Sequence, residues 1–256
     1  MTMEKTIYTS LMTLMPWMAL VVFLTLFFVK AGYGMFLNKR WGLSLPNKIG
    51  WMVMEFPAFL SMLLLWLRSD YDFYSVPFIF FLLFEVHYFQ RTFIFPLLMR
   101  GSSKMPISLM LMGIVFNVIN GFLLGEGLFL LVPNDKYTIN WLSTPQFTVG
   151  LFLFIVGMVI NLHSDSVIRN LRTKGDTKHY LPQRGMYKYV TSANYLGELT
   201  EWIGFAILTQ CDAAWVFTLW TFANLAPRSY TIRKHYMEIF GRDAVGKRKC
   251  LIPFIF

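Results

Sequence analysis

Residues 161–201 read NLHSDSVIRNLR, TKGDTKHYLPQRG and MYKYVTSANYLGELTE, a polar segment inside a chain that is otherwise largely apolar. Its polar side chains recur at helical spacings in two sets: Asn161, Asp165, Arg169 and Arg172, and then Asn194, Glu198 and Glu201. If both pieces are helical, each places its polar groups on one face. Polar faces at membrane depth are costly unless they line a cavity or bind a ligand. We therefore expect the chain to fold around this segment and to hold a polar ligand there.

The overall composition is that of a polytopic membrane protein. Of the 256 residues, 56% are hydrophobic and 14% are charged, whereas a soluble domain carries about 25% charged residues. The mean hydropathy is +0.51, and the length suits one membrane domain over residues 1–256. Because Cys211 and Cys250 are the only cysteines, we expect neither a disulfide framework nor a cysteine-based metal site.

Seven apolar segments are candidates for crossing the membrane, which requires about 20 mainly apolar residues per helix. These segments are Leu11–Val29, Gly50–Leu67, Val76–Leu98, Ile107–Leu131, Phe147–Leu162, Tyr195–Leu208 and Ala213–Ala226. The last is expected to continue as a helix beyond the membrane. The sequence therefore predicts an all-α fold with seven transmembrane helices.

The distribution of charge predicts how these helices are oriented. The net charge is +9, but the basic residues gather in alternate loops, as the positive-inside rule describes, rather than in a nucleic-acid-binding patch. This alternation predicts an N-terminus outside and a C-terminus in the cytoplasm, with the polar segment 161–201 accessible to a cytoplasmic cofactor. The membrane is that of the endoplasmic reticulum or a bacterial inner membrane, and we expect a monomer.

Two ionisable positions inside the predicted spans are candidates for catalysis. Glu55 lies in the second span, where a carboxyl group is expected to be neutral or hydrogen-bonded. In the third span, Tyr88 and Arg91 are three residues apart and share a helical face. A tyrosine hydroxyl beside a neutral carboxyl can donate to a carbonyl oxygen and stabilise charge that develops on it. The alternative is a structural polar cluster between helices, with Glu85 as an ion-pair partner.

The polar faces of residues 161–201 combine carboxylates, amides and arginines. Arg172 and Arg228 are suited to phosphate because the planar guanidinium binds it through two hydrogen bonds. The carboxylates are suited to ribose hydroxyls or an amide. The alternative is ion pairing between helices, such as Asp165 with Arg169.

Three familiar motifs are not matched. GRDAVGKR at 241–248 has the spacing of a phosphate-binding loop, but Arg248 stands where serine or threonine is needed and no apolar strand precedes it. No GxGxxG follows a predicted strand, so a Rossmann domain is not expected. His163 and Asp165 are two residues apart and point in different directions on a helix, so we expect no metal site.

Several separate stretches resemble the steroid 5α-reductases. They are MEFPAF at 54–59, HYFQRTFIFPLLMRG at 87–101, INLHSDSVIRNLR at 160–172, YVTSANYLGELTEWIGFA at 189–206 and LIPFIF at 251–256. The resemblance implies a seven-helix membrane enzyme that transfers hydride from NADPH to the 4,5 double bond of a 3-oxo-4-ene steroid. It further implies that Glu55 and Tyr88 hydrogen-bond the 3-keto oxygen.

The same resemblance implies a set of residues around NADPH. These are Asn161, Asp165, Arg172, Asn194, Glu198, Glu201, Arg228 and Tyr236, together with Trp51, Tyr33, Arg91 and Arg100. Three positions depart from the family pattern. Ile232 stands where histidine is frequent, Ser102 follows Gly101 where a second arginine is usual, and Phe95 replaces a common tyrosine. We expect these changes to affect phosphate binding and affinity more than the reaction type.

Two other functional classes remain open. Isoprenylcysteine methyltransferases and sterol reductases of the wider superfamily have His-Pro before Asn-Tyr-Leu-Gly, whereas this chain has Ser192-Ala193 there. That difference favours the 5α-reductase branch. A transporter or lipid-binding scaffold is also compatible with buried polar residues, but the hydropathy pattern has no inverted repeat, which counts against it.

Overall fold

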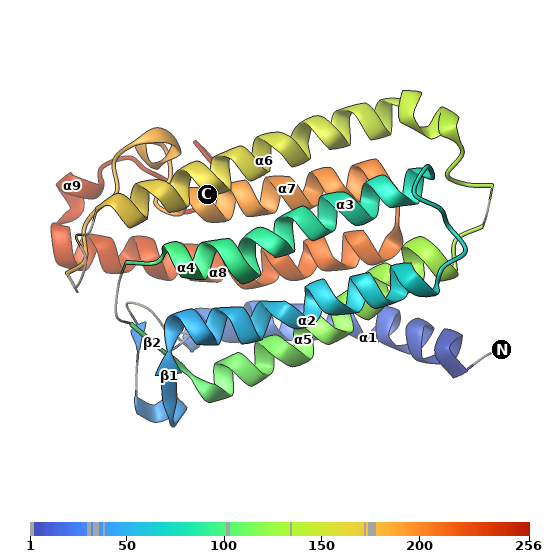
Figure 1. Ribbon diagram of the computed structural model, residues 1–256. Coiled ribbons are helices and arrows are strands. Elements are labelled where there is room, and N and C mark those ends of the chain that lie inside the picture. The colour runs from blue at the N-terminus through green and yellow to red at the C-terminus, as the bar shows by residue number, and fades with distance from the viewer. Residues whose placement is uncertain are drawn as a thin grey trace.

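The computed structural model describes residues 3–29, 32, 36–37, 39–100, 103–133, 135–171, 173 and 178–256. Helices dominate this part of the chain (Figure 1). The long helices are α1 (Met3–Phe28), α2 (Asn47–Arg68), α3 (Val76–Phe89), α5 (Ile107–Gly125), α6 (Pro145–Asn170), α7 (Ala193–Thr209) and α8 (Asp212–Phe240). Short helices α4 (Phe95–Leu98) and α9 (Arg242–Val245) complete the set.

Within the described residues, five helical segments are long and apolar enough to cross a membrane. They are Met3–Phe28, Asn47–Arg68, Val76–Leu98, Ile107–Leu130 and Pro145–Asn170. This agrees with an all-α integral membrane protein. The sixth and seventh predicted segments coincide with α7 and α8, and α8 continues to Phe240 as expected. α7 has only 17 residues, so it is too short to meet the same criterion.

Two π-helical turns interrupt the regular helices. Gln90–Ile94 joins α3 to α4, and Glu126–Leu130 extends α5. A π turn accommodates an extra residue and changes the direction of the side chains that follow, and such turns are frequent at functional sites. The first of them contains Arg91, at the point where α3 passes α2.

α6 and α7 run antiparallel with their backbones in close contact. Gly150 and Gly157 on α6 face Gly204 and Gly197 on α7, so that a Cβ added at Gly197 would lie 2.7 Å from the Gly157 carbonyl oxygen. Small residues allow this close approach in membrane helices. As a result, the polar face of residues 161–165 lies directly against the start of α7.

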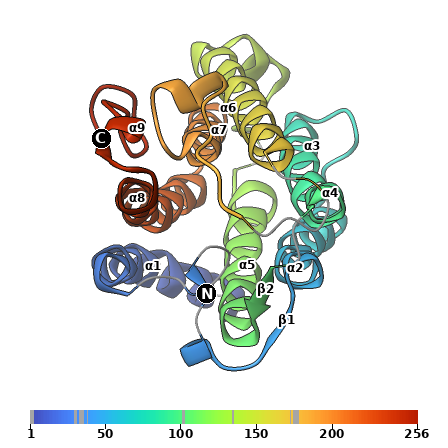
Figure 2. The same ribbon diagram turned by 90° about the vertical axis from the view of Figure 1, so that its left-hand side faces the viewer.

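The remaining helices complete a bundle around this pair. Viewed along the bundle, α1 lies beside α8, and α5 lies between α1 and α2 (Figure 2). The core between α3, α7 and α8 is aromatic: the Trp202 ring lies 4.6 Å from the Phe217 ring and 5.7 Å from the Phe205 ring. Trp202 and Phe205 are fully buried or nearly so.

A two-stranded antiparallel sheet aligns the starts of α2 and α5. Strand β1 (Ser44–Pro46) pairs with β2 (Lys104–Pro106), at the same end of the bundle as α4 and α9 (Figure 1). The all-α prediction did not include these strands, because three residues are too few for a recognisable alternation. Each strand leads directly into its helix, so Glu55 on α2 and Asn117 on α5 lie at matching depths.

The segment 249–256 folds back onto the residues that precede α7. Thr191 N donates to Lys249 O at 2.9 Å, and Ser192 N donates to Cys250 O at 3.1 Å. Leu251 is fully buried, and its N–H donates to Phe256 O at 2.8 Å. The distinctive ending LIPFIF therefore fixes the first turn of α7.

Candidate active site

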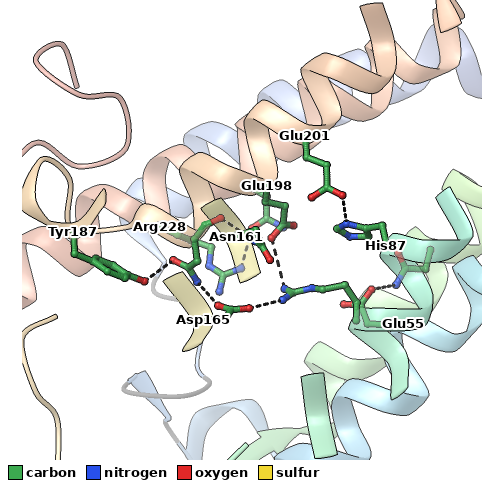
Figure 3. A network of polar contacts seen from close by, with 12 residues as sticks. Glu55, His87, Asn161, Asp165, Tyr187, Glu198, Glu201 and Arg228 are labelled. Atoms are coloured by element: carbon green, nitrogen blue, oxygen red, sulfur yellow. Dashed lines mark hydrogen bonds and ion pairs between the residues drawn. The ribbon is translucent and has the colours of Figure 1, made fainter. Parts of the chain in front are cut away.

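Arg91, in the π turn after α3, is the central cation of a buried polar network. Figure 3 labels two of its partners, Asp165 on α6 and Glu198 on α7. The Arg91 guanidinium lies 3.1 Å from Asp165 Oδ2 and 3.6 Å from Glu198 Oε2. Asp165 also accepts a hydrogen bond from Asn194 Nδ2 at 3.3 Å. The alternative pairing of Asp165 with Arg169 is therefore not the one that forms; Asp165 pairs across the bundle instead.

The network continues along the start of α7. Asn161 Nδ2 donates to the Asn194 carbonyl at 3.0 Å, and the Tyr187 hydroxyl donates to Asn194 Oδ1 at 3.4 Å. Burial raises the pKa of the Tyr187 hydroxyl well above its usual value, so it is a neutral donor. The two predicted polar faces thus meet each other, and Asn194 is held from both sides.

His87 and Glu201 form a second buried pair (Figure 3). His87 Nδ1 lies 2.8 Å from Glu201 Oε1, and the two side chains are only 6% and 1% exposed. The sequence interpretation named Glu201 but gave His87 no role. His87 is four residues before Arg91, so the helical spacing that selected Tyr88 and Arg91 could also have selected it.

Glu55 and Tyr88 are each held by an asparagine of α5. Asn117 Nδ2 donates to Glu55 Oε2 at 3.3 Å and to the Met54 carbonyl at 2.7 Å. Tyr88 is 3% exposed, and its hydroxyl lies within interaction range of the Asn120 side chain. Glu55 is half-buried and lies within electrostatic range of Arg91.

The asparagines Asn117 and Asn120 were missed at the level of sequence. They are three residues apart in an apolar span, a spacing that places two amides on one helical face. Polar residues inside a membrane span are functional candidates by default, so that signal was available.

Two aromatic rings enclose the Arg91 guanidinium. Its Cζ lies 5.2 Å from the centre of the Trp51 ring and 4.6 Å from that of Phe95. Cations bind aromatic faces in this range. Phenylalanine at position 95 keeps the ring face that a tyrosine would offer and lacks only the hydroxyl.

Arg228 and Tyr236 lie on α8. The Arg228 guanidinium lies 5.5 Å from the centre of the Tyr195 ring, and its Nη1 donates to Asn224 Oδ1 at 3.3 Å. Tyr236 is 5% exposed and lies within electrostatic range of Tyr187. Both therefore border the α7 side of the network.

The other predicted positions either lie away from this cluster or fall outside the described residues. Arg100 is exposed just after α4. Tyr33, Arg172 and Ser102 lie outside the described residues. Glu85 is 8% exposed, and within the described chain neither of its carboxyl oxygens has a hydrogen-bond partner. Its interpretation as an ion-pair partner is therefore wrong.

Comparisons with known proteins identify the family. A family model described as 3-oxo-5-alpha-steroid 4-dehydrogenase matches residues 103–256. The chain is 37% identical to human 3-oxo-5-alpha-steroid 4-dehydrogenase 2 over 88% of each chain. It is 34% identical to 3-oxo-5-alpha-steroid 4-dehydrogenase 1 of Bos taurus over 93% of each. It is 32% identical to steroid 5-alpha-reductase DET2 of Gossypium hirsutum over 100% of each.

The chain belongs to the steroid 5α-reductase family. The family resemblance expected from the sequence is thereby confirmed, and the chain is an oxidoreductase of this family. Its matched region, 103–256, includes α6, α7 and α8 with the polar faces described above. The catalytic candidates Glu55 and Tyr88 precede that region, but the alignments with whole relatives extend over most of the chain.

Proposed function

We propose that this steroid 5α-reductase family member reduces the 4,5 double bond of a 3-oxo-4-ene steroid, or a related enone lipid, with NADPH. The observation that carries the proposal is the convergence of Glu55 and Tyr88 with the Arg91 network. Arg91 is within electrostatic range of Glu55 and Tyr88 and is paired to Asp165 and Glu198. One cluster thus combines groups that can donate to a carbonyl oxygen with groups that can bind a nucleotide.

The substrate half of the site is organised for electrophilic activation. Glu55 in its neutral form and Tyr88 donate hydrogen bonds to the 3-keto oxygen. Because Asn117 donates to Glu55 and the Asn120 side chain lies within interaction range of Tyr88, the two groups are oriented before the reaction begins, which makes their stabilisation of the developing oxyanion effective. Polarisation of the oxygen makes carbon 5 electron-poor, so that carbon 5 can accept a hydride and the double-bond electrons move onto an enolate. Uptake of a proton at carbon 4 then restores the 3-keto group and completes the 5α product.

The cofactor half has the groups that a dinucleotide requires. NADPH supplies the hydride when it is bound. Asp165, Glu198 and Asn194 offer acceptors and a donor for ribose hydroxyls and an amide, and Arg228 offers a cation for phosphate. Two buried atoms at α7, Ser192 Oγ and Glu201 Oε2, have no hydrogen-bond partner within the described chain. Unpaired buried polar atoms are uncommon, and a bound nucleotide would satisfy them.

We also propose the full membrane topology of seven helices, with the N-terminus outside, the C-terminus cytoplasmic and residues 1–256 forming one monomeric domain. The alternation of basic loops supports this orientation. The membrane is that of the endoplasmic reticulum or a bacterial inner membrane, and the cofactor site faces the cytoplasm. Labelling single cysteines introduced at Asn140 and at Lys247 from each side of sealed vesicles tests it, since the two residues should react from opposite sides.

The test of the reaction is product analysis. Purified protein in detergent is incubated with NADPH and a 3-oxo-4-ene steroid, and mass spectrometry should detect the 5α-reduced product together with NADPH consumption. Methyl transfer from S-adenosylmethionine without NADPH consumption would place the chain with the methyltransferase branch. Steroid binding without product, whichever nucleotide is supplied, would favour the lipid-binding scaffold.

A further inference from the structure

His87 lies between the two halves of the candidate site. Its ring meets the Tyr88 ring edge-on, with centroids 5.1 Å apart. On the other side, its Nδ1 lies 2.8 Å from Glu201 Oε1. The Trp202 ring packs against it at 4.6 Å. The imidazole is therefore fixed by a residue of the substrate half and by two consecutive residues of α7.

Helix packing alone does not require a polar pair at this place. Phe84, one turn before His87, already packs against Trp202 and Phe205 with centroids 5.9 Å and 6.3 Å apart. Removing a carboxylate from water is costly, and an apolar pair of similar volume would hold two helices together at least as well. The His87–Glu201 hydrogen bond therefore has a consequence other than joining α3 to α7.

That consequence is the orientation of the Glu201 carboxylate. Because His87 occupies Oε1, the second oxygen is fixed in direction, and Oε2 is buried without a partner in the described chain. Glu198, one turn earlier on α7, is engaged by Arg91. Glu201 Oε2 is thus a buried acceptor of α7 that has no donor within the described chain.

We propose that His87 is a positioning residue for the reaction. Through Glu201 it directs Oε2 at an N–H or O–H donor of the bound nucleotide, and through ring contact it sets the position of the Tyr88 phenol. This inference rests on the proposed function and adds a residue to it. One side chain then fixes the distance between the hydride donor and the polarised enone, and errors of about 1 Å in such a distance cost about 100-fold in rate.

Two isosteric variants separate this role from simple packing. His87→Asn places an amide nitrogen near the position of Nδ1 and keeps the donor to Glu201, whereas His87→Gln places it near Nε2 and does not. We expect His87→Gln to raise the Kd for NADPH about tenfold, as expected for losing a hydrogen bond to a charged group, and to enlarge the deuterium isotope effect with labelled NADPH. His87→Asn should retain Kd within about threefold, well inside the range of one such bond.

The link through Glu201 is tested by a double-mutant cycle. If His87 acts by orienting Glu201, Glu201→Gln combined with His87→Gln should weaken NADPH binding no more than the worse single variant, because coupled residues are not additive. His235→Gln is the matched control: His235 lies 3.7 Å from Glu238, which is 52% exposed, away from the network. It should leave Kd and the isotope effect unchanged.

Equal NADPH Kd values and equal isotope effects for His87→Gln, His87→Asn and the unmodified enzyme would overturn the inference, as would losses that multiply in the double variant. If the Gln variant does not fold, His87→Phe, which keeps a ring but has no donor for Glu201, takes its place in both comparisons, and equal Kd values or losses that multiply count against the inference in the same way. Failure of the unmodified enzyme to bind NADPH or reduce an enone would instead refute the proposed function.

Discussion

The α6/α7 pair and the α2/α5 pair both use glycines, but in different ways. On α6 and α7 the glycines face backbone: a Cβ at Gly157 would collide with the N and Cα of Glu201. On α5 the glycines mainly face side chains of α2: a Cβ at Gly113 would meet the Met54 thioether. A flexible side chain can move aside, whereas a packed backbone cannot without separating the helices.

This difference divides the site into a rigid half and an adaptable half. The proposed nucleotide groups, Asp165, Asn194 and Glu198, lie on the pair that cannot move apart. The proposed steroid groups lie on helices joined by aromatic side chains, such as Phe59 and Phe93 with ring centroids 5.7 Å apart. A constant cofactor needs a fixed frame, while substrates of varied shape are better accommodated by side chains that can repack.

The largest effect is expected from breaking the rigid half. Gly157→Ala forces α6 away from α7 and should destabilise the protein by about 3 kcal/mol, with loss of NADPH binding and activity. Thermal unfolding in detergent and NADPH titration measure both. Gly113→Ala is the matched control, since Met54 can rotate, and it should leave NADPH affinity unchanged. Equal losses in the two variants would refute the distinction.

In the adaptable half, replacing the proposed catalytic groups is expected to lower turnover strongly without affecting the rigid half. Tyr88→Phe removes one donor to the carbonyl oxygen, and Glu55→Gln replaces the acidic carboxyl O–H by a weaker amide N–H. Each should lower kcat about 100-fold, as loss of an oxyanion donor does. The Kd for NADPH should stay within about twofold, because the hydrogen-bond partners of these side chains lie on α5 rather than α7. Steady-state kinetics and NADPH titration are the measurements, and unchanged kcat in both variants would show that the catalytic assignment is wrong.

A smaller effect is expected one step further from the substrate. Asn120→Leu keeps the volume but removes the polar interaction with the Tyr88 hydroxyl, and we expect kcat to fall about tenfold, the cost of one lost buried polar interaction. The same change in a Tyr88→Phe background should have almost no further effect, since the hydroxyl is already absent. If Asn120→Leu still lowers kcat about tenfold in the Tyr88→Phe background, Asn120 acts through a group other than the Tyr88 hydroxyl.

The smallest effect is expected at the aromatic cover of Arg91. Phe95→Tyr introduces the tyrosine that the family resemblance led us to expect and keeps a ring beside the guanidinium, which lies 4.6 Å from the Phe95 ring centre. A nearly volume-conserving change of this kind should alter the NADPH Kd by less than about fivefold. NADPH titration measures this Kd. A larger change would show that the added hydroxyl, and not only the ring face at position 95, affects nucleotide binding.

The sequence predicted the helices well and the partners of the site residues poorly. Hydropathy located the five spanning segments, and helical spacing placed Asn161 with Asp165 and Asn194 with Glu198. Spacing defines a face but not the helix that it meets, so Arg91 as the partner of Asp165 was not predicted. The α5 asparagines beside Glu55 and Tyr88 were missed although their spacing places two amides on one face of an apolar span. Strands of three residues and π turns leave no periodic signal, so β1, β2 and the turn at Gln90 were also absent from the prediction.

The pairing of Thr191 and Ser192 with Lys249 and Cys250 also determines when the site can be completed during synthesis. Chains fold from the N-terminal side as they emerge from the ribosome, and Glu55 and Tyr88 are made early. Asn194 emerges much later, and its turn of α7 is fixed only after residues 249–256 have been translated and have docked. Nascent chains arrested before that point should be inserted in the membrane yet unable to retain the nucleotide, so cofactor binding reports on the docking of residues 249–256.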